Sequence, residues 1–165
     1  MLKYIFSLSL FLSQLCAPNV TAASNQSINV FVMPNKAEIN NMELVIADLV
    51  NLERTRRGLP SLKYSKELAA CAREHSRNMA IKEVKVGHDG FEARFKHMQK
   101  IMKLRSFGEN VYYSYGILDF LKAAVKGWMD SPSHKENILG KYKMSGVGIA
   151  FGEDGSFYVT QLFGS

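Results

Sequence analysis

Two histidines and one glutamate are the residues of this 165-residue sequence best suited to chemistry. His88 follows Gly87, Glu109 stands between a glycine and a strand-like run, and His134 lies three residues after Ser131. Functional side chains concentrate in loops and at element ends, and imidazoles with a carboxylate are a common ligand set for an open zinc site. The separations of 21 and 25 residues match no local metal motif. The pattern alone therefore leaves a metal site open but favours side chains without a chemical role.

The remaining histidines and one cysteine favour structural roles. His75 lies on the apolar face of an expected helix and is interpreted as a buried core histidine, whereas His97 lies among lysines and is interpreted as solvated. Cys71 stands in the helical run Leu68-Ala69-Ala70-Cys71-Ala72, where a buried thiol is a better interpretation than a nucleophile.

The first 23 residues have the pattern of a secretory signal peptide. Lys3 is their only charge, an apolar stretch runs from Tyr4 to about Leu15, and small residues precede Ser24. The apolar stretch is shorter than the roughly 20 residues that span a bilayer. We therefore predict a signal peptide over residues 1–23, with a buried N-terminal helix as the alternative.

Cys16 adds an alternative, because a cysteine just after the apolar run is where a bacterial lipoprotein is acylated. The residue before it is Leu15, whereas lipoprotein signals favour a small residue there. Secretion or a cell-envelope location is expected, with an outer-surface lipoprotein and membrane association through Cys16 as the alternative.

Net charge limits the partners. Loss of Lys3 with the signal peptide changes the net charge from +6 to +6 − 1 = +5. This charge favours anionic lipid or cell-wall polymer, or only reflects solvated lysines. No nucleic-acid-binding module is recognisable. We expect a monomer without internal disulfides, because Cys71 is the only cysteine left in the mature chain.

The elements that must position these residues follow from periodicity and capping signals. Residues 24–40 are interpreted as a linker or arm and residues 41–165 as one domain. The expected helices are one that Asn40 or Asn41 caps and Gly58 ends, one from Ser65 to near Lys82, one from Phe91 to about Leu104, one from about Leu118 to Met129, and a short one that the Ser131 hydroxyl caps and Gly140 ends.

The C-terminal part is predicted to be β-structure. Residues 147–151 alternate apolar and small side chains, Glu153-Asp154-Gly155 is a hairpin turn, and residues 157–163 form a second strand. A short strand over residues 111–113 would complete an antiparallel sheet. Helices followed by a hairpin predict an α+β fold with helices packed on the sheet.

Taken together, these segments resemble the CAP superfamily (SCP domain), which includes cysteine-rich secretory proteins, venom antigens and plant pathogenesis-related proteins. The resemblance is closest to its compact bacterial branch and covers roughly Val45 to Phe163. The seven segments that carry it, in the family's order, are Asn51-x-x-Arg54 with Gly58-Leu59-Pro60-x-Leu62; Leu68-x-x-x-Ala72-x-x-His75-Ser76-x-x-Met79-Ala80; Gly87-His88-Asp89-Gly90-Phe91-x-x-Arg94; Gly108-Glu109-Asn110-Val111; Trp128-Met129-x-Ser131-Pro132-x-His134-x-x-Asn137-Ile138-Leu139; Gly146-Val147-Gly148-Ile149-Ala150; and Tyr158-x-Thr160-Gln161-x-Phe163.

The resemblance implies a three-layer α-β-α sandwich and a polar cavity that holds two histidines and two glutamates in many members. The matching positions here are His88, Glu109 and His134, while Ser131 occupies the position of the second glutamate. The implied cavity is therefore formed by these four residues and has an incomplete tetrad. Its candidate metal ligands are the two histidines and Glu109, for Zn²⁺ or another divalent cation.

Three functions are compatible with this resemblance. The first is a non-enzymatic binding module for a lipid, glycan or peptide, which the absence of an evident nucleophile favours. The second is a metal-assisted hydrolase of peptide or cell wall, in which Glu109 would take a proton from a zinc-bound water. The third is sterol or fatty-acid binding, for which an aromatic stretch could line a groove; its residues are Phe107, Tyr112, Tyr113, Tyr115 and Phe120.

Overall fold

The structure is a computed structural model that describes residues 33–117 and 119–165. The predicted signal peptide 1–23, Cys16 and residues 24–32 of the predicted arm lie outside the described residues. Within the described part of the chain, no helix is long and apolar enough to cross a membrane.

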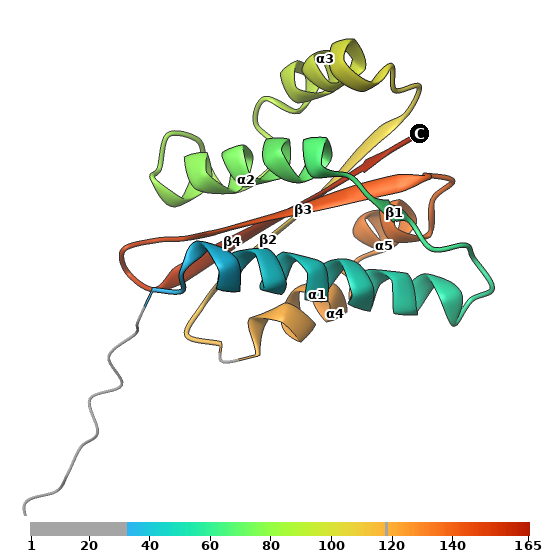
Figure 1. The fold of residues 1–165 in the computed structure, drawn as a ribbon. Coiled ribbons are helices and arrows are strands. Elements are labelled where there is room, and N and C mark those ends of the chain that lie inside the picture. The colour runs from blue at the N-terminus through green and yellow to red at the C-terminus, as the bar shows by residue number, and fades with distance from the viewer. Residues whose placement is uncertain (1–32, 118) are drawn as a thin grey trace, which may run out of the picture. The chain divides into compact units, whose positions relative to one another are not determined.

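Five helices and four strands follow one another along the described residues (Figure 1). Their order and bounds are α1 (Lys36–Thr55), β1 (Lys63–Tyr64), α2 (Lys66–Ala80), α3 (Phe91–Met102), β2 (Phe107–Tyr115), α4 (Phe120–Asp130), α5 (Pro132–Leu139), β3 (Met144–Phe151) and β4 (Ser156–Gly164).

The four strands form one sheet in the order β1-β3-β4-β2. β4 pairs antiparallel with both β3 and β2, and its register places Thr160 opposite Gly148 and Leu162 opposite Glu109. β1 pairs with β3 in the parallel direction, so the sheet is mixed rather than purely antiparallel. β1 was not predicted, because a strand of two residues has no alternation of apolar and polar side chains that a pattern could show.

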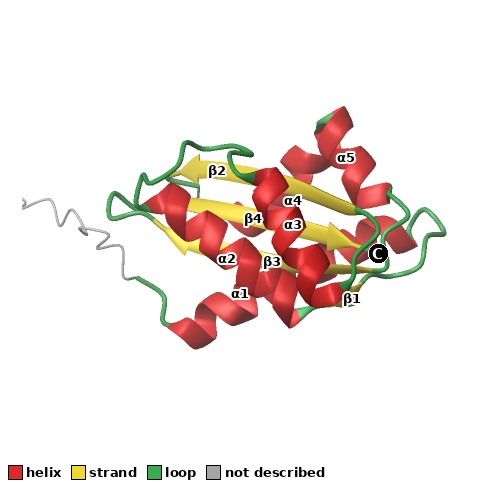
Figure 2. Ribbon diagram, turned by 90° about the horizontal axis from the view of Figure 1, so that it is seen from above, coloured by secondary structure: helices red, strands yellow, loops and turns green. Residues whose placement is uncertain are grey.

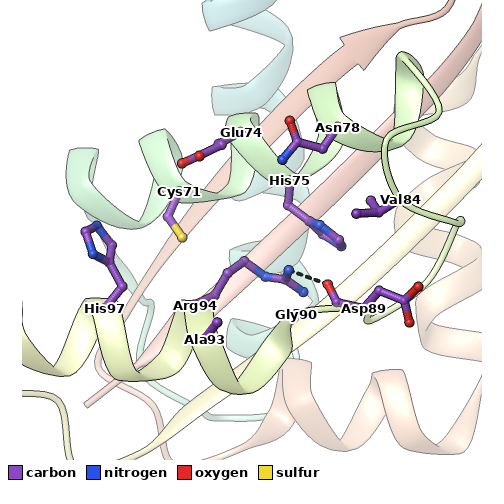
Figure 3. A pocket seen from close by; sticks show the side chains of 10 residues that line it. All are labelled: Cys71, Glu74, His75, Asn78, Val84, Asp89, Gly90, Ala93, Arg94 and His97. Carbon is purple, nitrogen blue, oxygen red and sulfur yellow. Dashed lines mark hydrogen bonds between the residues drawn. The ribbon is translucent and has the colours of Figure 1, made fainter.

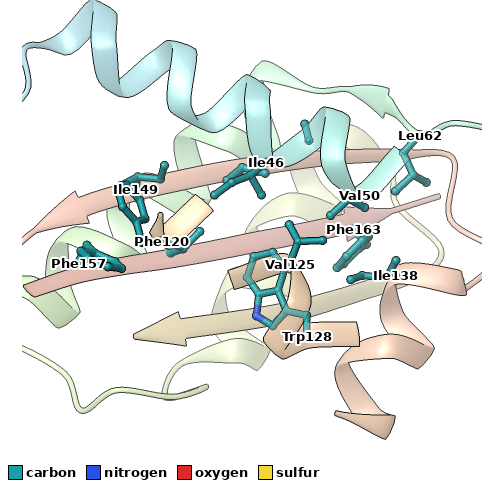
Figure 4. Packing of buried hydrophobic residues seen from close by; sticks show 13 residues of the cluster. Ile46, Val50, Leu62, Phe120, Val125, Trp128, Ile138, Ile149, Phe157 and Phe163 are labelled. Carbon is teal, nitrogen blue, oxygen red and sulfur yellow. The ribbon is translucent and has the colours of Figure 1, made fainter. Parts of the chain in front are cut away.

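The helices cover both faces of the sheet, which confirms the predicted α+β sandwich (Figures 1 and 2). α2 and α3 lie on one face, and α1, α4 and α5 lie on the other. The larger core lies on the α1 side and includes Trp128 and Phe163 (Figure 4). The smaller core lies under α2 and α3 and contains Leu68, Cys71, Ala72, Met98, Leu104 and Leu162.

Two glycines let α2 approach the backbone of β3 directly. A Cβ at Gly146 would lie 2.6 Å from the carbonyl carbon of Leu68, and a Cβ at Gly148 would overlap the backbone of Ala72 and Arg73. Both glycines thus permit close packing of the hairpin under a helix. At these two positions α2 is held against β3 with no space for a β3 side chain between them.

α1 begins earlier than predicted. Asn35 is its N-cap, accepting from the amides of Ala37 (2.9 Å) and Glu38 (3.1 Å), while the Glu38 carboxylate accepts from the Asn35 amide (2.7 Å). The predicted cap at Asn40 or Asn41 is wrong because this reciprocal capping box satisfies the free amides one turn earlier. The last residues of the predicted arm therefore form the first turn of α1.

A buried arginine joins α1 to α5. Arg54 is 1% exposed and donates from Nη1 to the carbonyl oxygens of Ile138 (2.6 Å) and Gly140 (2.9 Å), and from Nε to that of Pro60 (2.9 Å). The last carbonyls of a helix have no partner within the helix, so Arg54 satisfies those at the end of α5. This contact fixes the C-terminal end of α5 against α1.

Candidate functional site

Glu109 lies in β2 with its side chain only 1% exposed. Arg94 of α3 donates from Nε to Oε2 and from Nη2 to Oε1, both at 2.8 Å. Two parallel bonds of this kind are the strongest arrangement between a guanidinium and a carboxylate. Arg94 thus neutralises Glu109 and ties α3 to the sheet.

His88 approaches the same carboxylate from the loop that precedes α3. Its Nδ1 lies 2.9 Å from Oε1 of Glu109, and 51% of its side chain is exposed. A carboxylate bound by Arg94 only accepts, so Nδ1 of His88 carries the proton and Nε2 is the atom left with a lone pair in the neutral ring. Arg94 also donates to the Asp89 carbonyl (2.7 Å), which fixes this loop beside β2.

His134 faces His88 from the first turn of α5. The two ring centroids are 6.3 Å apart. Burial, and secondly the charge of His88, lowers the pKa of His134 below its ordinary value of 6.5. The ring is therefore biased toward its neutral form, which is the form that binds metals.

Two asparagines link β2 to α5. Asn110 donates from Nδ2 to the His134 carbonyl at 3.0 Å. Asn137 donates from Nδ2 to Oδ1 of Asn110 at 2.9 Å and to the Glu109 carbonyl at 3.1 Å. The family motifs that contain these asparagines therefore set the distance between the strand that carries Glu109 and the helix that carries His134.

His75 lies beside Glu109 and is a core histidine, as predicted. It is 3% exposed, its Nε2 lies 2.8 Å from the Gly87 carbonyl, and the same atom is 4.0 Å from Oε1 of Glu109. A carbonyl only accepts, so Nε2 carries a proton. Burial is the largest cause that lowers the pKa of His75 below 6.5.

Ser131 is not joined to the other three predicted cavity residues by a hydrogen bond in the described chain. It is the backbone N-cap of α5, but its hydroxyl does not cap the helix and instead lies 3.5 Å from the Ser133 hydroxyl. The structure thus brings His88, Glu109 and His134 together. The expectation that the Ser131 hydroxyl caps α5 is wrong, because this hydroxyl is directed to that of Ser133 and makes no hydrogen bond to an amide of the first turn.

The three candidate ligands do not converge on one point as a ligand set. Among the described residues there is no group of three or more His, Cys, Asp or Glu side chains that could hold a metal ion. Both oxygens of Glu109 are engaged by Arg94. The candidate ligands that remain are the imidazoles of His88 and His134, with Glu109 behind His88.

A cavity of about 380 Å³ lies between α2 and α3, next to this cluster (Figure 3). His75 and Arg94 line it, whereas His88, Glu109 and His134 do not. Cys71 also lines it, and burial raises the pKa of this thiol to about 11. The prediction that Cys71 is a buried thiol is confirmed, and a thiol with a raised pKa is mostly protonated at neutral pH.

Sequence reasoning did not find the role of Arg94. The residue stands in the motif Gly90-Phe91-x-x-Arg94, but no spacing rule links an arginine on a helix to a glutamate fifteen residues later on a strand. The available signal was the positive charge of Arg94, since a buried carboxylate such as that of Glu109 requires a charged or hydrogen-bonding partner.

The predicted aromatic stretch does not line one groove. Phe107 contacts Phe91 and Phe95 under α3, with centroids 5.4 and 5.3 Å away. Tyr112 points to the opposite face and packs on the larger core, and Tyr115 is 66% exposed. Alternation along β2 divides these side chains between two faces.

Comparison with known proteins agrees with this architecture. The extracellular SCP-domain protein of Bacillus anthracis str. Ames is 26% identical, with a TM-score of 0.64 over 81% of this chain and 44% of that protein. An outer surface protein of Borrelia burgdorferi is 20% identical, with a TM-score of 0.64 over 81% of this chain and 96% of that protein, and shares the fold.

Curated relatives are bacterial as well. The uncharacterized protein YkwD of Bacillus subtilis (strain 168) is 27% identical over 131 residues, which are 78% of this chain and 49% of that protein. The uncharacterized membrane protein YlbC of the same organism is 30% identical over 112 residues, which are 65% of this chain and 31% of that protein. The chain thus spans half or less of the length of these relatives.

A family model described as the cysteine-rich secretory protein family, CAP, matches residues 47–163. This range includes every motif that builds the cluster, from Asn51 to Phe163. The chain therefore belongs to the cysteine-rich secretory protein (CAP) family.

Proposed function

We propose that this protein is an exported, non-enzymatic binding module whose His88 and His134 hold a divalent cation, with Zn²⁺ as the first candidate. Glu109 does not bind the cation and instead orients His88. The ligand that the module presents or captures is a lipid, glycan or peptide.

The observation that carries this proposal is the pairing of Arg94 with both oxygens of Glu109. A general base needs a free lone pair directed at the water it deprotonates. In this arrangement Glu109 faces a guanidinium on one side and His88 on the other. The pairing supports a binding role over a metal-assisted hydrolase.

Support for the cation comes from the two histidines. A carboxylate that accepts from one ring nitrogen fixes the orientation and tautomer of a metal-binding histidine, and His88 has this arrangement with Glu109. His134 is biased toward the neutral form by its burial. A bound Zn²⁺ would supply a positive charge and open coordination positions for a ligand or water.

Calorimetric titration of zinc into the chelator-treated full chain tests the cation site. We expect binding that disappears in His88→Ala/His134→Ala and persists in His97→Ala, an exposed histidine outside the pair. Glu109→Gln should weaken binding about tenfold, the effect of losing a partner of a metal-binding histidine. Unchanged binding in the double variant, or no binding in the wild type, would refute the cation site.

A separate assay tests the non-enzymatic assignment. We expect no turnover of peptide or peptidoglycan substrates by zinc-loaded protein above that of the double variant. Turnover that depends on Glu109 would instead establish the hydrolase.

A groove between α1 and α4 favours fatty-acid binding as a second candidate. It has a volume of about 330 Å³, with Leu49, Leu52, Val125 and Met129 among its lining. Arg56, Glu53, Lys122 and Lys126 also line it. Each of the three cations forms an ion pair with a neighbouring carboxylate, and an acyl chain that ends in a carboxylate would exchange with these partners.

Mass spectrometry of an organic extract of the purified full chain tests this candidate. We expect fatty acid in the wild type and none in Leu52→Glu, which places a negative charge in the groove. Leu44→Glu is the matched control, because Leu44 is 44% exposed on α1, like Leu52 at 43%, and lies outside the groove. Equal lipid content in both variants would reject this groove as the lipid site.

Export rests on the N-terminal pattern and on the related protein of Bacillus anthracis, which is described as extracellular. Mass spectrometry of the chain recovered from its native host separates the two forms of export. A chain that begins at Ser24 supports secretion, an acylated Cys16 supports an envelope lipoprotein, and an intact Met1 contradicts both.

A further inference from the structure

The cavity between α2 and α3 combines an apolar lining with acidic groups. Cys71, Val84 and Ala93 contribute its apolar part, and Glu74 and Asp89 are among its polar lining (Figure 3). Its volume of about 380 Å³ lies in the range of small-molecule sites. Neither His88 nor His134 lines it, so an occupant here would not contact the two proposed cation ligands.

One nitrogen of the buried His75 ring has no partner. Figure 3 shows the imidazole directed from α2 toward α3. Nε2 is used by the Gly87 carbonyl, and Nδ1 makes no hydrogen bond to any described residue. In the described chain, Oε1 of Gln161 is the only fully buried side-chain polar atom without a partner. Nδ1 therefore retains solvent access, and His75 reaches solvent in the cavity that it lines.

This nitrogen is a hydrogen-bond acceptor. Nε2 carries the proton of the neutral ring, because the Gly87 carbonyl can only accept. The lone pair of Nδ1 is then free to accept from solvent in the cavity. An occupant that displaces this solvent has to donate a hydrogen bond to His75, because an acceptor left buried without a donor is costly.

The charge of the lining favours a cation. Glu74 and Asp89 have no ion pair or side-chain hydrogen bond with the described residues, so both carboxylates are available. Arg94 is the one arginine of the lining, and its charge is already neutralised by Glu109. With histidines counted as neutral, the lining presents two unpaired negative charges and no unpaired positive charge.

We propose that the cavity between α2 and α3 binds a small organic cation, an amine that carries an apolar group. The ammonium donates to Nδ1 of His75. The carboxylates of Glu74 and Asp89, two exposed residues that lie on either side of His75 in Figure 3, attract its charge. The apolar group lies against Cys71 and Ala93. A carboxylate ligand of the same size is rejected, because it would meet the same negative charges and offer His75 no donor.

Three probes of one size test this assignment: benzylamine, benzyl alcohol and benzoate. They are titrated at neutral pH into the isotope-labelled, chelator-treated full chain, and backbone amide shifts are followed by NMR. We expect benzylamine to shift amides of α2 and α3 around the cavity. Benzyl alcohol should bind about fivefold more weakly, the effect of one charge interaction of about 1 kcal/mol in water. Benzoate should leave these amides unshifted.

Variants separate charge from shape. Glu74→Gln/Asp89→Asn should weaken benzylamine binding at least about fivefold, and Ala93→Phe should abolish it by filling the cavity from an exposed position on α3. Glu92→Gln removes an exposed charge of the same helix outside the cavity and should change nothing. The amide spectrum of each variant shows whether it is folded.

Three outcomes would overturn the proposal. Benzoate could shift the same amides as strongly as benzylamine, which would indicate an apolar cavity without charge selection. Ala93→Phe could leave benzylamine binding intact, which would place the ligand elsewhere. Finally, benzylamine could leave the amides around the cavity unshifted throughout the titration.

Discussion

α2 and α3 cover the same face of the sheet in opposite ways. α2 lies with its backbone against two glycines of β3, so no β3 side chain separates helix from sheet at these two positions. α3 has a single buried residue, Met98, and leaves a cavity of about 380 Å³ between itself and α2. The side of the cluster that α2 forms is therefore fixed by close packing, whereas the side that α3 forms is not.

The difference shows how a polar cluster replaces packing. α3 contributes one fully buried side chain, Met98, and the partly buried Phe95 and Met102 to the smaller core. Its strongest tie to β2 is the two-bond pairing of Arg94 with Glu109. The fixed helix supplies His75, and the loosely packed helix supplies the arginine that neutralises the buried carboxylate.

The largest expected effect comes from removing the close approach of α2. Gly148→Ala should cost more than about 4 kcal/mol of unfolding free energy, because its Cβ would overlap the backbone of Ala72 and Arg73, which cannot move aside as a side chain can. Urea unfolding followed by circular dichroism measures it.

Gly127→Ala is the matched control, since its Cβ would lie 3.4 Å from the Tyr112 ring, an ordinary contact. It should stabilise α4 by about 0.5–1 kcal/mol. Equal effects of the two substitutions would show that α2 is not held by backbone contact.

The next largest effect is expected from removing the pairing of Arg94 with Glu109, which joins α3 to β2. Arg94→Met should destabilise the protein by about 3 kcal/mol, because it leaves the Glu109 carboxylate buried without its main partner. The double variant Arg94→Met/Glu109→Gln should recover part of this loss, as the unpaired charge is removed. A double variant less stable than Arg94→Met in urea unfolding would contradict this account.

Truncating the one buried residue of α3 should have a smaller effect. Met98→Ala should cost about 2 kcal/mol, the low end for a buried methionine, because α3 can settle into the space. Hydrogen exchange should also show α3 amides opening at lower free energy than α2 amides. Identical protection of both helices would remove the contrast between them.

The smallest effect concerns pH. The pKa of His75 in the folded protein is below its ordinary value of 6.5, so the unfolded chain binds the proton more readily. Stability is therefore complete above pH 6.5 and falls as pH decreases below it, by at most about 1.4 kcal/mol per pH unit for one proton. His134 acts in the same direction.

His75→Gln keeps a donor for the Gly87 carbonyl but does not titrate. Urea unfolding across this pH range should show a shallower loss of stability in this variant, with the remainder due to His134. A wild-type protein that gains stability on acidification over this range would show that the sign is wrong.

Local signals predicted most of the fold. Ser65 at the start of α2, Gly140 at the end of α5 and the turn at 153–155 all stand where the sequence placed them. Such signals act within a few residues and need no tertiary partner. The helix start at Lys36 was also readable, because Asn35 and Glu38 have the spacing of a capping box.

Long-range partners were not predictable in the same way. β2 has nine residues rather than three, because pairing with β4 along its whole length extends it beyond its short apolar run. The burial of Glu109 depends on Arg94 from another element, and the sequence shows neither the distance nor the geometry. The cavity between α2 and α3 has no sequence signal, since it results from how loosely two helices meet.

The buried Arg54 has a consequence for the order of folding. It joins the end of α1 to carbonyls of α5 that lie 84 and 86 residues later in the chain. Contacts so distant in sequence form only after much of the chain has become ordered, which slows folding. We therefore expect α5, and His134 with it, to become protected late in pulse-labelling experiments, after α2 and the β3–β4 hairpin. Arg54→Lys, which cannot reach three carbonyls at once, should delay that step selectively.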